Sequence, residues 1–290
     1  MIGINHAAIA QRSGAYIQLH PQLLWLGLVA TLPGLVTATS GSREILKQYA
    51  ASPVGLVGLL CLGLALLLIA NAALGALVRS TLVFEQEQAR LMPLAALKLA
   101  GAPIALPLTQ LQLVSWLFSL LTLVVVLFLG GLLIFAVAGT ATIPGSFEAL
   151  FTLYPVLFPF FVLLSAVALV VLVVLAVQRE LAVREISFEK AGVLVSLRRA
   201  TAMLRSQTPL IFWALLQWLL IVVGISLVST IVTDPLQSTG VSLIASGIGS
   251  ILSWFSEALI FSFTAIYWTL QYRALRYLEV VTLTKPEERG

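Results

Sequence analysis

The sequence predicts an all-α membrane protein that crosses the bilayer several times. Of its 290 residues, 60% are hydrophobic and 10% are charged, whereas ordinary soluble domains carry about 25% charged residues. Six segments are mostly apolar over about 20 residues, the length that crosses roughly 30 Å of hydrocarbon. These segments lack the two-residue alternation of a transmembrane β-barrel. Each must therefore satisfy its backbone hydrogen bonds internally, as a helix.

The six predicted transmembrane helices form one integral membrane domain over residues 1–290. Proline suits the first turn of a helix but not its interior, so Pro21 and Ser52-Pro53 mark the starts of the first two spans. Pro33-Gly34 is expected to kink the first span or end it early. Pro155 and Pro159 predict a kink in the fourth. The stretch from Val241 favours an outward extension of the last span. The predicted spans cover about residues 22–39, 54–78, 111–137, 150–177, 210–232 and 250–272.

Lysine and arginine are distributed unevenly between the segments that flank the spans. The two tails and the connections after the second and fourth spans hold 14 of them, and the opposite side holds 2, Arg43 and Lys47. Because cytoplasmic loops carry an excess of these residues, the sequence predicts cytoplasmic N- and C-termini in a bacterial inner (plasma) membrane. Five aromatic residues near this boundary are interpreted as an interfacial belt: Trp213, Trp218, Tyr267, Trp268 and Tyr272.

The first span has a second interpretation. Arg12, the apolar stretch that follows it and Val36-Thr37-Ala38 resemble a secretory signal peptide with a small-residue cleavage site. Cleavage would leave five spans without changing the sidedness of the others. Whether the first span is retained or removed stays open at this point.

Two cytoplasmic connections have the pattern of amphipathic helices lying in the membrane interface. In residues 191–207, Leu194, Leu197, Thr201 and Leu204 recur at helical spacing, and the cations point elsewhere. Residues 89–102 have a comparable layout. Basic residues near the surface attract anionic headgroups. The predicted lipid or partner contacts are Arg198, Arg199, Arg205, Lys98 and Arg90, and the alternative is that these cations only fix topology.

The residues that follow the second and fourth spans suggest two further features. Residues 179–190 mix charges of both signs, which is interpreted as a solvated continuation of the fourth span braced by weak pairs at i,i+4. Phe84-Glu85 and Phe188-Glu189 stand at similar places before the two basic stretches. They indicate a parallel internal repeat offset by about a hundred residues, of the kind that transporters use.

The sequence contains none of the common catalytic patterns that were sought. There is no H-E-x-x-H zinc helix and no G-x-S-x-G elbow. The single cysteine, Cys61, excludes a disulfide framework. We therefore expect no enzyme activity, no metal, no cofactor and no nucleic-acid partner. Because an ionisable residue within the membrane is a functional candidate by default, Glu257 defines a candidate polar site. Its predicted members are Glu257, Ser253, Gly249 and Asn71, which would form a proton or cation site. The alternatives are that Glu257 is a partly hydrated carboxylate near the outer interface, paired with a hydroxyl or a water, and that Asn71 only joins helices.

Two segments in the second half of the chain resemble a known family. They read S-L-R-R-A-T-A-M-L-R from Ser196 to Arg205 and Y-W-T-L-Q-Y-R-A-L-R from Tyr267 to Arg276. Over about residues 180–280 the chain resembles the bacterial six-span families grouped around the membrane domain of glycerophosphoryl diester phosphodiesterases and their stand-alone relatives. The soluble phosphodiesterase barrel is absent from this sequence, so the resemblance implies an integral membrane role and not that activity.

Together these patterns predict a non-enzymatic scaffold or accessory subunit. It would contact anionic headgroups, a membrane-protein partner or a second copy of the chain through its cytoplasmic basic helices. The alternative function is a small-molecule or ion permease component that uses the carboxylate of Glu257.

Overall fold

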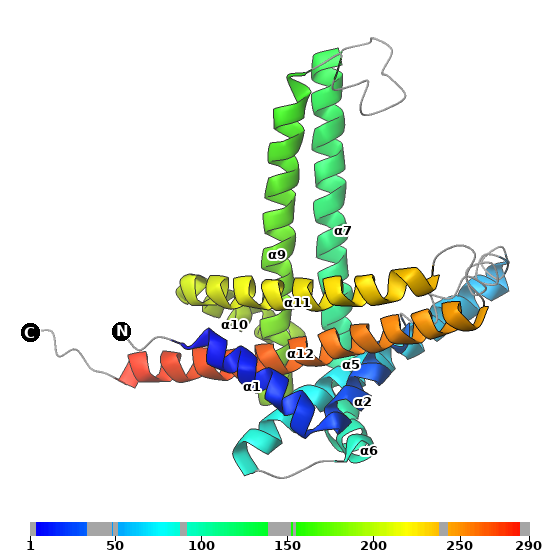
Figure 1. The fold of residues 1–290 in the computed structure, drawn as a ribbon. Helices are drawn as coiled ribbons and strands as arrows, with labels where there is room; N and C mark the ends of the chain where they lie inside the picture. The colour runs from blue at the N-terminus through cyan, green and yellow to red at the C-terminus, as the bar shows by residue number, and fades with distance from the viewer. Residues whose placement is uncertain are drawn as a thin grey trace, which may run out of the picture. The chain divides into compact units, whose positions relative to one another are not determined.

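The described part of the chain is almost entirely helical. The computed structural model describes residues 4–33, 48, 52–87, 92–138, 152, 155–237 and 243–284, and no strand occurs among them. This confirms the all-α prediction. The chain forms two compact units, the first made of Met1–Gln110 and Leu181–Gly290 and the second of Leu111–Glu180. Figure 1 labels the helices of both.

Among the described residues, five helices are long and apolar enough to cross a membrane, and they overlap the second to sixth predicted spans. The first predicted span, 22–39, is not confirmed, because its described part forms a helix of only 10 residues and residues 34–39 lie outside the described residues. The helices are α1 (His6–Leu19), α2 (Pro21–Ala30), α5 (Pro53–Glu87), α6 (Pro93–Ala96), η1 (Leu97–Gly101), α7 (Ala102–Ala138), α9 (Leu157–Glu189), α10 (Val193–Ser206), α11 (Thr208–Gln237) and α12 (Leu243–Thr284).

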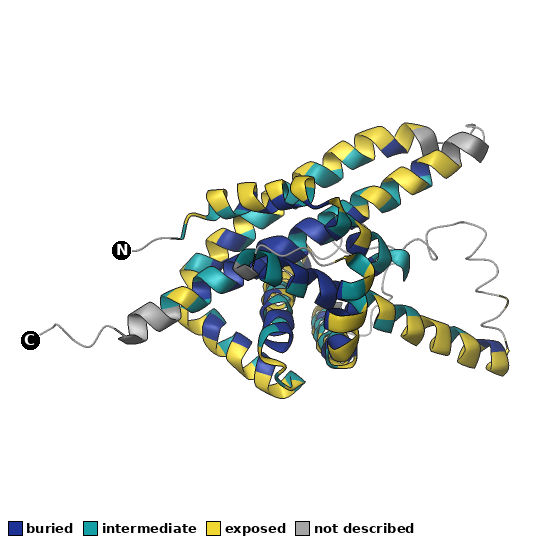
Figure 2. Ribbon diagram, turned by 90° about the horizontal axis from the view of Figure 1, so that it is seen from below, coloured by how far each residue is buried: buried dark blue, intermediate teal, exposed yellow. Residues whose placement is uncertain are grey.

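The most apolar stretches of the chain are exposed. In the most apolar 18-residue windows of α5, α7 and α9, only 0%, 6% and 6% of the residues are buried. Figure 2 shows long exposed stretches along the helices. An uncovered apolar surface of this extent is unstable in water but stable in hydrocarbon. These helices are therefore compatible with a multi-pass membrane protein.

Local sequence signals explain several helix ends. The hydroxyl of Ser52 accepts a hydrogen bond from the backbone N–H of Gly55 at 3.0 Å, so Ser52 caps α5 and Pro53 fills its first turn, as predicted. Helix α2 ends at Ala30, but Leu32 and Pro33 are helical again and residues 34–39 lie outside the described residues, so the effect expected of Pro33-Gly34 stays a prediction. The predicted kink at Pro155 and Pro159 is wrong, because α9 begins only at Leu157 and Pro159 lies in its first turn, where no intrahelical N–H is needed.

The basic stretch 89–102 does not form a separate interfacial helix in its described part. Helix α6 runs through η1 into α7, and the apolar helix is continuous from Pro93 to Val137. Element η1 is a π-helix, a widened turn that often accommodates an irregular residue. Pro103 lies two residues beyond its end, and Pro107 lies further along α7. Since proline clashes with the carbonyl four residues earlier, the widened turn explains how the helix continues.

The core of the first unit lies where α12 passes the other helices. Helix α12 contacts α1, α2, α5 and α11. Its residues from 265 to 272 are all buried, and so are residues 71–78 of α5 and 181–187 of α9. The interpretation of 179–190 as a solvated continuation is therefore wrong for 181–187. Tyr267, Trp268 and Tyr272 are at most 1% exposed, so they belong to this core and not to an interfacial belt.

Glycine permits two close helix approaches in this unit. A Cβ atom at Gly27 of α2 would lie 2.7 Å from the carbonyl oxygen of Ala258 in α12. At Gly101 of η1 it would lie 2.9 Å from the carbonyl carbon of Ala72 in α5 and would meet that residue's oxygen as well. A backbone group cannot turn aside as a flexible side chain can, so these positions require glycine.

We expect Gly101→Ala to destabilise the first unit by about 1–3 kcal/mol, the usual cost of overpacking. Thermal unfolding of the purified full chain measures this loss. Gly63→Ala in α5 is the matched control, because a Cβ there meets nothing within 4 Å. Equal melting temperatures for the two variants would show that the two helices can separate freely at Gly101.

The second unit consists of the remaining parts of α7 and α9, which lie side by side (Figure 1). Gly130 of α7 faces the ring of Phe161 in α9, where a Cβ would lie 3.3 Å from Cε1. Most side chains along this pair are exposed and apolar, as expected for helices surrounded by lipid.

Candidate functional site

Two carboxylates with little exposure, and the more exposed arginines that pair with them, gather at one end of the first unit, where α5, α9 and α12 meet. The side chain of Glu85, at the end of α5, is 10% exposed. Its Oε1 lies 2.8 Å from Nη2 of Arg12 and also accepts a hydrogen bond from the hydroxyl of Tyr16. Its Oε2 lies 3.1 Å from Nη1 of Arg273. We call Glu85, Arg12, Tyr16 and Arg273 the Glu85 cluster. It joins α1, α5 and α12.

A second cluster joins α9, α10 and α12. Glu185 is 2% exposed, and its Oε1 accepts a hydrogen bond from the hydroxyl of Tyr272 at 2.7 Å. Arg276 lies 3.5 Å from the same oxygen, and Arg199 of α10 lies 3.3 Å from Oε2. Both arginines also approach Glu189, which is half exposed, at 3.4 and 3.9 Å. We call Glu185, Glu189, Arg199, Tyr272 and Arg276 the Glu185 cluster.

The two clusters share a carboxylate that is at most 10% exposed, a tyrosine hydroxyl and two arginines, with a phenylalanine ring against the tyrosine, and the Glu185 cluster contains Glu189 in addition. The ring centroids lie 5.1 Å apart for Phe84 and Tyr16 and 4.9 Å apart for Phe188 and Tyr272. The proposed internal repeat matches Phe84-Glu85 with Phe188-Glu189 in sequence. In the structure, however, the carboxylate equivalent to Glu85 is Glu185, one helical turn before Glu189.

Tyr16 keeps its proton in this environment. Burial, followed by the hydrogen bond to Glu85 and its negative charge, raises the pKa of Tyr16 above its usual value. The phenol therefore donates to the carboxylate throughout the neutral pH range. Each of the two carboxylates thus accepts a hydrogen bond from a tyrosine and pairs with two arginines, and these contacts hold the helices together. No metal-binding group of three or more acidic, histidine or cysteine side chains occurs among the described residues.

Further polar contacts reinforce this end of the unit. Arg184 is fully buried and donates to the carbonyl oxygen of Ala265 at 3.1 Å. Arg79 donates to the carbonyl oxygen of Ser187, also at 3.1 Å, which ties α5 to α9. Gln207, between α10 and α11, donates to the carbonyl oxygen of Leu275. Buried polar groups are stable only when they are hydrogen-bonded, so these contacts fix the helix ends relative to one another.

The structure separates the predicted lipid or partner contacts into two kinds. Arg199 belongs to the Glu185 cluster. Arg198, Arg205 and Lys98 are exposed, and no ion pair or hydrogen bond of their side chains occurs within the described part of the chain. Arg90 lies outside the described residues. On α10 the buried face is formed by Ser196, Ala200 and Met203.

The residues of the predicted intramembrane site do not converge on one cavity. Glu257 is exposed, Ser253 is partly exposed and Gly249 is buried, all on α12. Asn71 lies elsewhere, on α5, and donates to the hydroxyl of Thr109 in α7 at 3.2 Å and to the carbonyl oxygen of Leu67. It therefore joins two helices, as the alternative interpretation expects.

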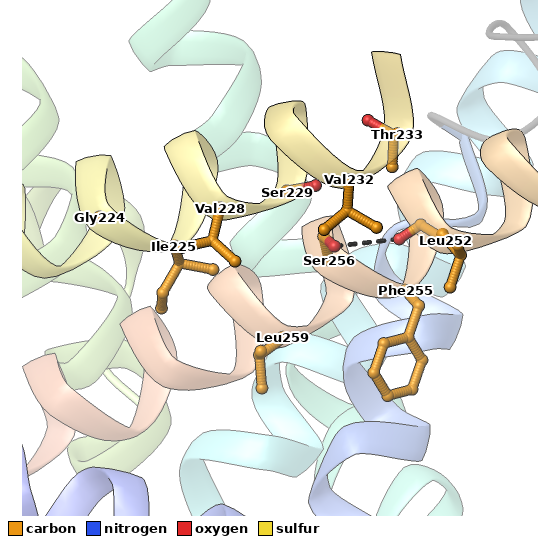
Figure 3. A pocket seen from close by; sticks show the side chains of 10 residues that line it. All are labelled: Gly224, Ile225, Val228, Ser229, Val232, Thr233, Leu252, Phe255, Ser256 and Leu259. Carbon is orange, nitrogen blue, oxygen red and sulfur yellow. Dashed lines mark hydrogen bonds between the residues drawn. The ribbon is translucent and has the colours of Figure 1, made fainter. Parts of the chain in front are cut away.

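An apolar groove of about 400 Å³ lies between α11 and α12 (Figure 3). Its ten lining residues include the hydroxyls of Ser229, Thr233 and Ser256 but no charged group, and Glu257 is not among them. The hydroxyl of Ser256 donates to the carbonyl oxygen of Leu252 at 3.0 Å. The groove suits an apolar occupant and provides no ionisable group for transport chemistry.

The sequence did not identify the two carboxylate clusters. Their members lie far apart along the chain, with Glu85 and Arg273 separated by 188 residues.

Comparison with known protein families, with curated proteins and with solved structures found no match. The family resemblance of residues 180–280 therefore stays a prediction.

Proposed function

We propose that this chain is a non-enzymatic multi-pass protein of a bacterial inner membrane, acting as a scaffold or accessory subunit through a cytoplasmic basic surface. The observation that carries this proposal is the division of the cations among the described residues. Seven arginines are held in ion pairs or hydrogen bonds within the chain: Arg12, Arg79, Arg179, Arg184, Arg199, Arg273 and Arg276. Lys98, Lys190, Arg198 and Arg205 stay exposed without such a partner.

The position of α1 supports the common location of both termini. Arg12 and Arg273 pair with the same carboxylate, Glu85. The N-terminal helix therefore lies at the same end of the first unit as the last turns of α12. By the excess of positive charge this end faces the cytoplasm. A retained first span over 22–39 gives an even number of crossings, consistent with this arrangement.

Labelling of single cysteines tests the orientation. Cys61 is the chain's one cysteine, so Cys61→Ala supplies a background into which Gln11→Cys, Ser206→Cys or Asp234→Cys is placed, all at exposed positions. We expect a membrane-impermeant maleimide to label Asp234→Cys in intact spheroplasts, and the other two only after the membrane is opened. Labelling of Ser206→Cys from outside would contradict the cytoplasmic placement of α10, and labelling of Gln11→Cys would contradict the even number of crossings.

The accessory role is tested on the full chain extracted with its surrounding lipid. We expect Arg198→Ala combined with Arg205→Ala to lower the amount of retained anionic lipid or of a stoichiometric co-purified subunit. The proposal loses its support if the variant keeps the same lipids and subunits as the unchanged chain.

A further inference from the structure

Helix α10 lies at the membrane boundary because of its connection to α11. It ends at Ser206, and α11, which is apolar enough to cross the membrane, begins at Thr208. Only Gln207 separates them, and its side chain is tied to Leu275 of α12. A helix joined to a span by one residue cannot lie far from the headgroup layer, since consecutive Cα atoms are 3.8 Å apart.

The two sides of α10 face different surroundings. Ser196, Ala200 and Met203 pack against the protein. The opposite side is exposed and begins with two aliphatic side chains, Leu194 at 79% and Val195 at 49% exposure. Arg198, Ala202 and Arg205 continue the exposed side at intervals of three or four residues, which places them on one helical face. We call Leu194, Val195, Arg198 and Arg205 the outer face of α10.

Both charged residues of the outer face of α10 are positive. Arg199, the neighbouring cation, is paired with Glu185 and Glu189. Arg198 and Arg205 have no ion pair within the described part of the chain. They lie two turns apart, about 10 Å along the helix. Guanidinium groups bind phosphate oxygens through two parallel hydrogen bonds, and the headgroup layer supplies phosphates at this depth.

We propose that the outer face of α10 binds anionic phospholipid, with Arg198 and Arg205 on phosphate oxygens and Leu194 and Val195 among the upper acyl carbons. This proposal rests on the proposed function and names the partner of its basic surface. Aliphatic residues beside arginines on a helix next to a span fit a lipid surface. A soluble anion would need only the arginines.

Native mass spectrometry of the purified full chain in detergent tests this proposal. The chain is titrated with phosphatidylglycerol or with phosphatidylcholine of the same acyl chains, and the first binding constant is measured for each. We expect a preference for phosphatidylglycerol. Because each basic residue near an anionic surface contributes about 1 kcal/mol, Arg198→Ala with Arg205→Ala should weaken phosphatidylglycerol binding roughly thirtyfold and leave phosphatidylcholine binding unchanged.

Three controls make the result specific. Lys98→Ala removes an exposed cation that lies outside the outer face of α10, on η1, and should weaken phosphatidylglycerol binding less than Arg198→Ala with Arg205→Ala does. Leu194→Ser with Val195→Ser should weaken the binding of both lipids. Unfolding temperatures should stay constant, because all these side chains are exposed or partly exposed. An equal loss for Lys98→Ala, or equal occupancy of the face by inorganic phosphate, would overturn the lipid assignment.

The lipid assignment can fail without the proposed function. If the unchanged chain shows no preference between the lipids, the lipid assignment is wrong, and the basic surface is left for a protein partner. Reversed orientation in the cysteine labelling, in contrast, would contradict the proposed function itself.

Discussion

Replacing Glu185 with alanine is expected to cause the largest loss of stability of any single substitution considered for this chain, about 2–4 kcal/mol. The carboxylate is 2% exposed and accepts the hydroxyl of Tyr272 while pairing with Arg199 and Arg276. Breaking a buried pair usually costs about 3–5 kcal/mol, because the remaining partner is left uncompensated. Here the arginines are 48% and 35% exposed and can turn to solvent, so we expect a smaller cost. Tyr272 is buried and cannot turn away.

Glu189 provides a matched control one turn further along α9. It pairs with the same two arginines, but it is half exposed, and exposed pairs contribute about 0–1 kcal/mol. Thermal unfolding of the two alanine variants in the same detergent should therefore differ clearly. Equal losses would show that the number of ion pairs, and not the buried hydrogen bond to Tyr272, determines the stability of the Glu185 cluster.

The fold could be predicted from sequence wherever the signal is local. The length of an apolar stretch predicts a span, and Ser52-Pro53 predicts the start of α5, because both depend on neighbouring residues. Helix α1 was missed because its sequence, HAAIAQRSGAYIQL, is neither strongly apolar nor clearly patterned. Its position depends on contacts with α11 and α12, which no local pattern contains.

Only part of the candidate site could be predicted from the sequence, for a related reason. The number of lysines and arginines in each connection predicts on which side of the membrane the connection lies. It does not predict which of these residues form ion pairs, because pairing depends on residues distant in the chain. Arg199 was grouped with Arg198 and Arg205, although Glu185, 14 residues away, holds it in the structure. Mixed charges in 179–190 suggested solvent. Of these charges, Arg184 and Glu185 are buried, because Arg184 donates to the carbonyl oxygen of Ala265 and Glu185 pairs with two arginines and accepts a hydrogen bond from Tyr272.

Replacing Glu85 with alanine is expected to release α1 while most of the first unit stays folded. Helix α1 buries only Ala10, Ser13 and Tyr16, so little apolar contact holds it. Two of the three groups on Glu85, Arg12 and Tyr16, belong to this helix. Loss of both contacts should raise the population in which α1 is detached by about tenfold or more.

Limited trypsin digestion measures this release directly. Arg12 is in the middle of α1, and a helical bond must unfold locally before a protease can cleave it. The fragment that begins at Ser13 should therefore appear at least about tenfold faster in Glu85→Ala than in the unchanged chain. Tyr16→Phe keeps the ion pair with Arg12 and should give an intermediate rate, whereas Glu189→Ala should give the unchanged rate.

The remaining contacts of α1 set the limit of this effect. His6 approaches the amide oxygen of Gln271 at 3.2 Å, at the other end of the helix. If this contact and its neighbours hold α1 without Glu85, the rate of cleavage after Arg12 will not change. The Glu85 cluster would then fix α12 to α5 through Arg273 alone, and its loss would appear in the unfolding temperature instead.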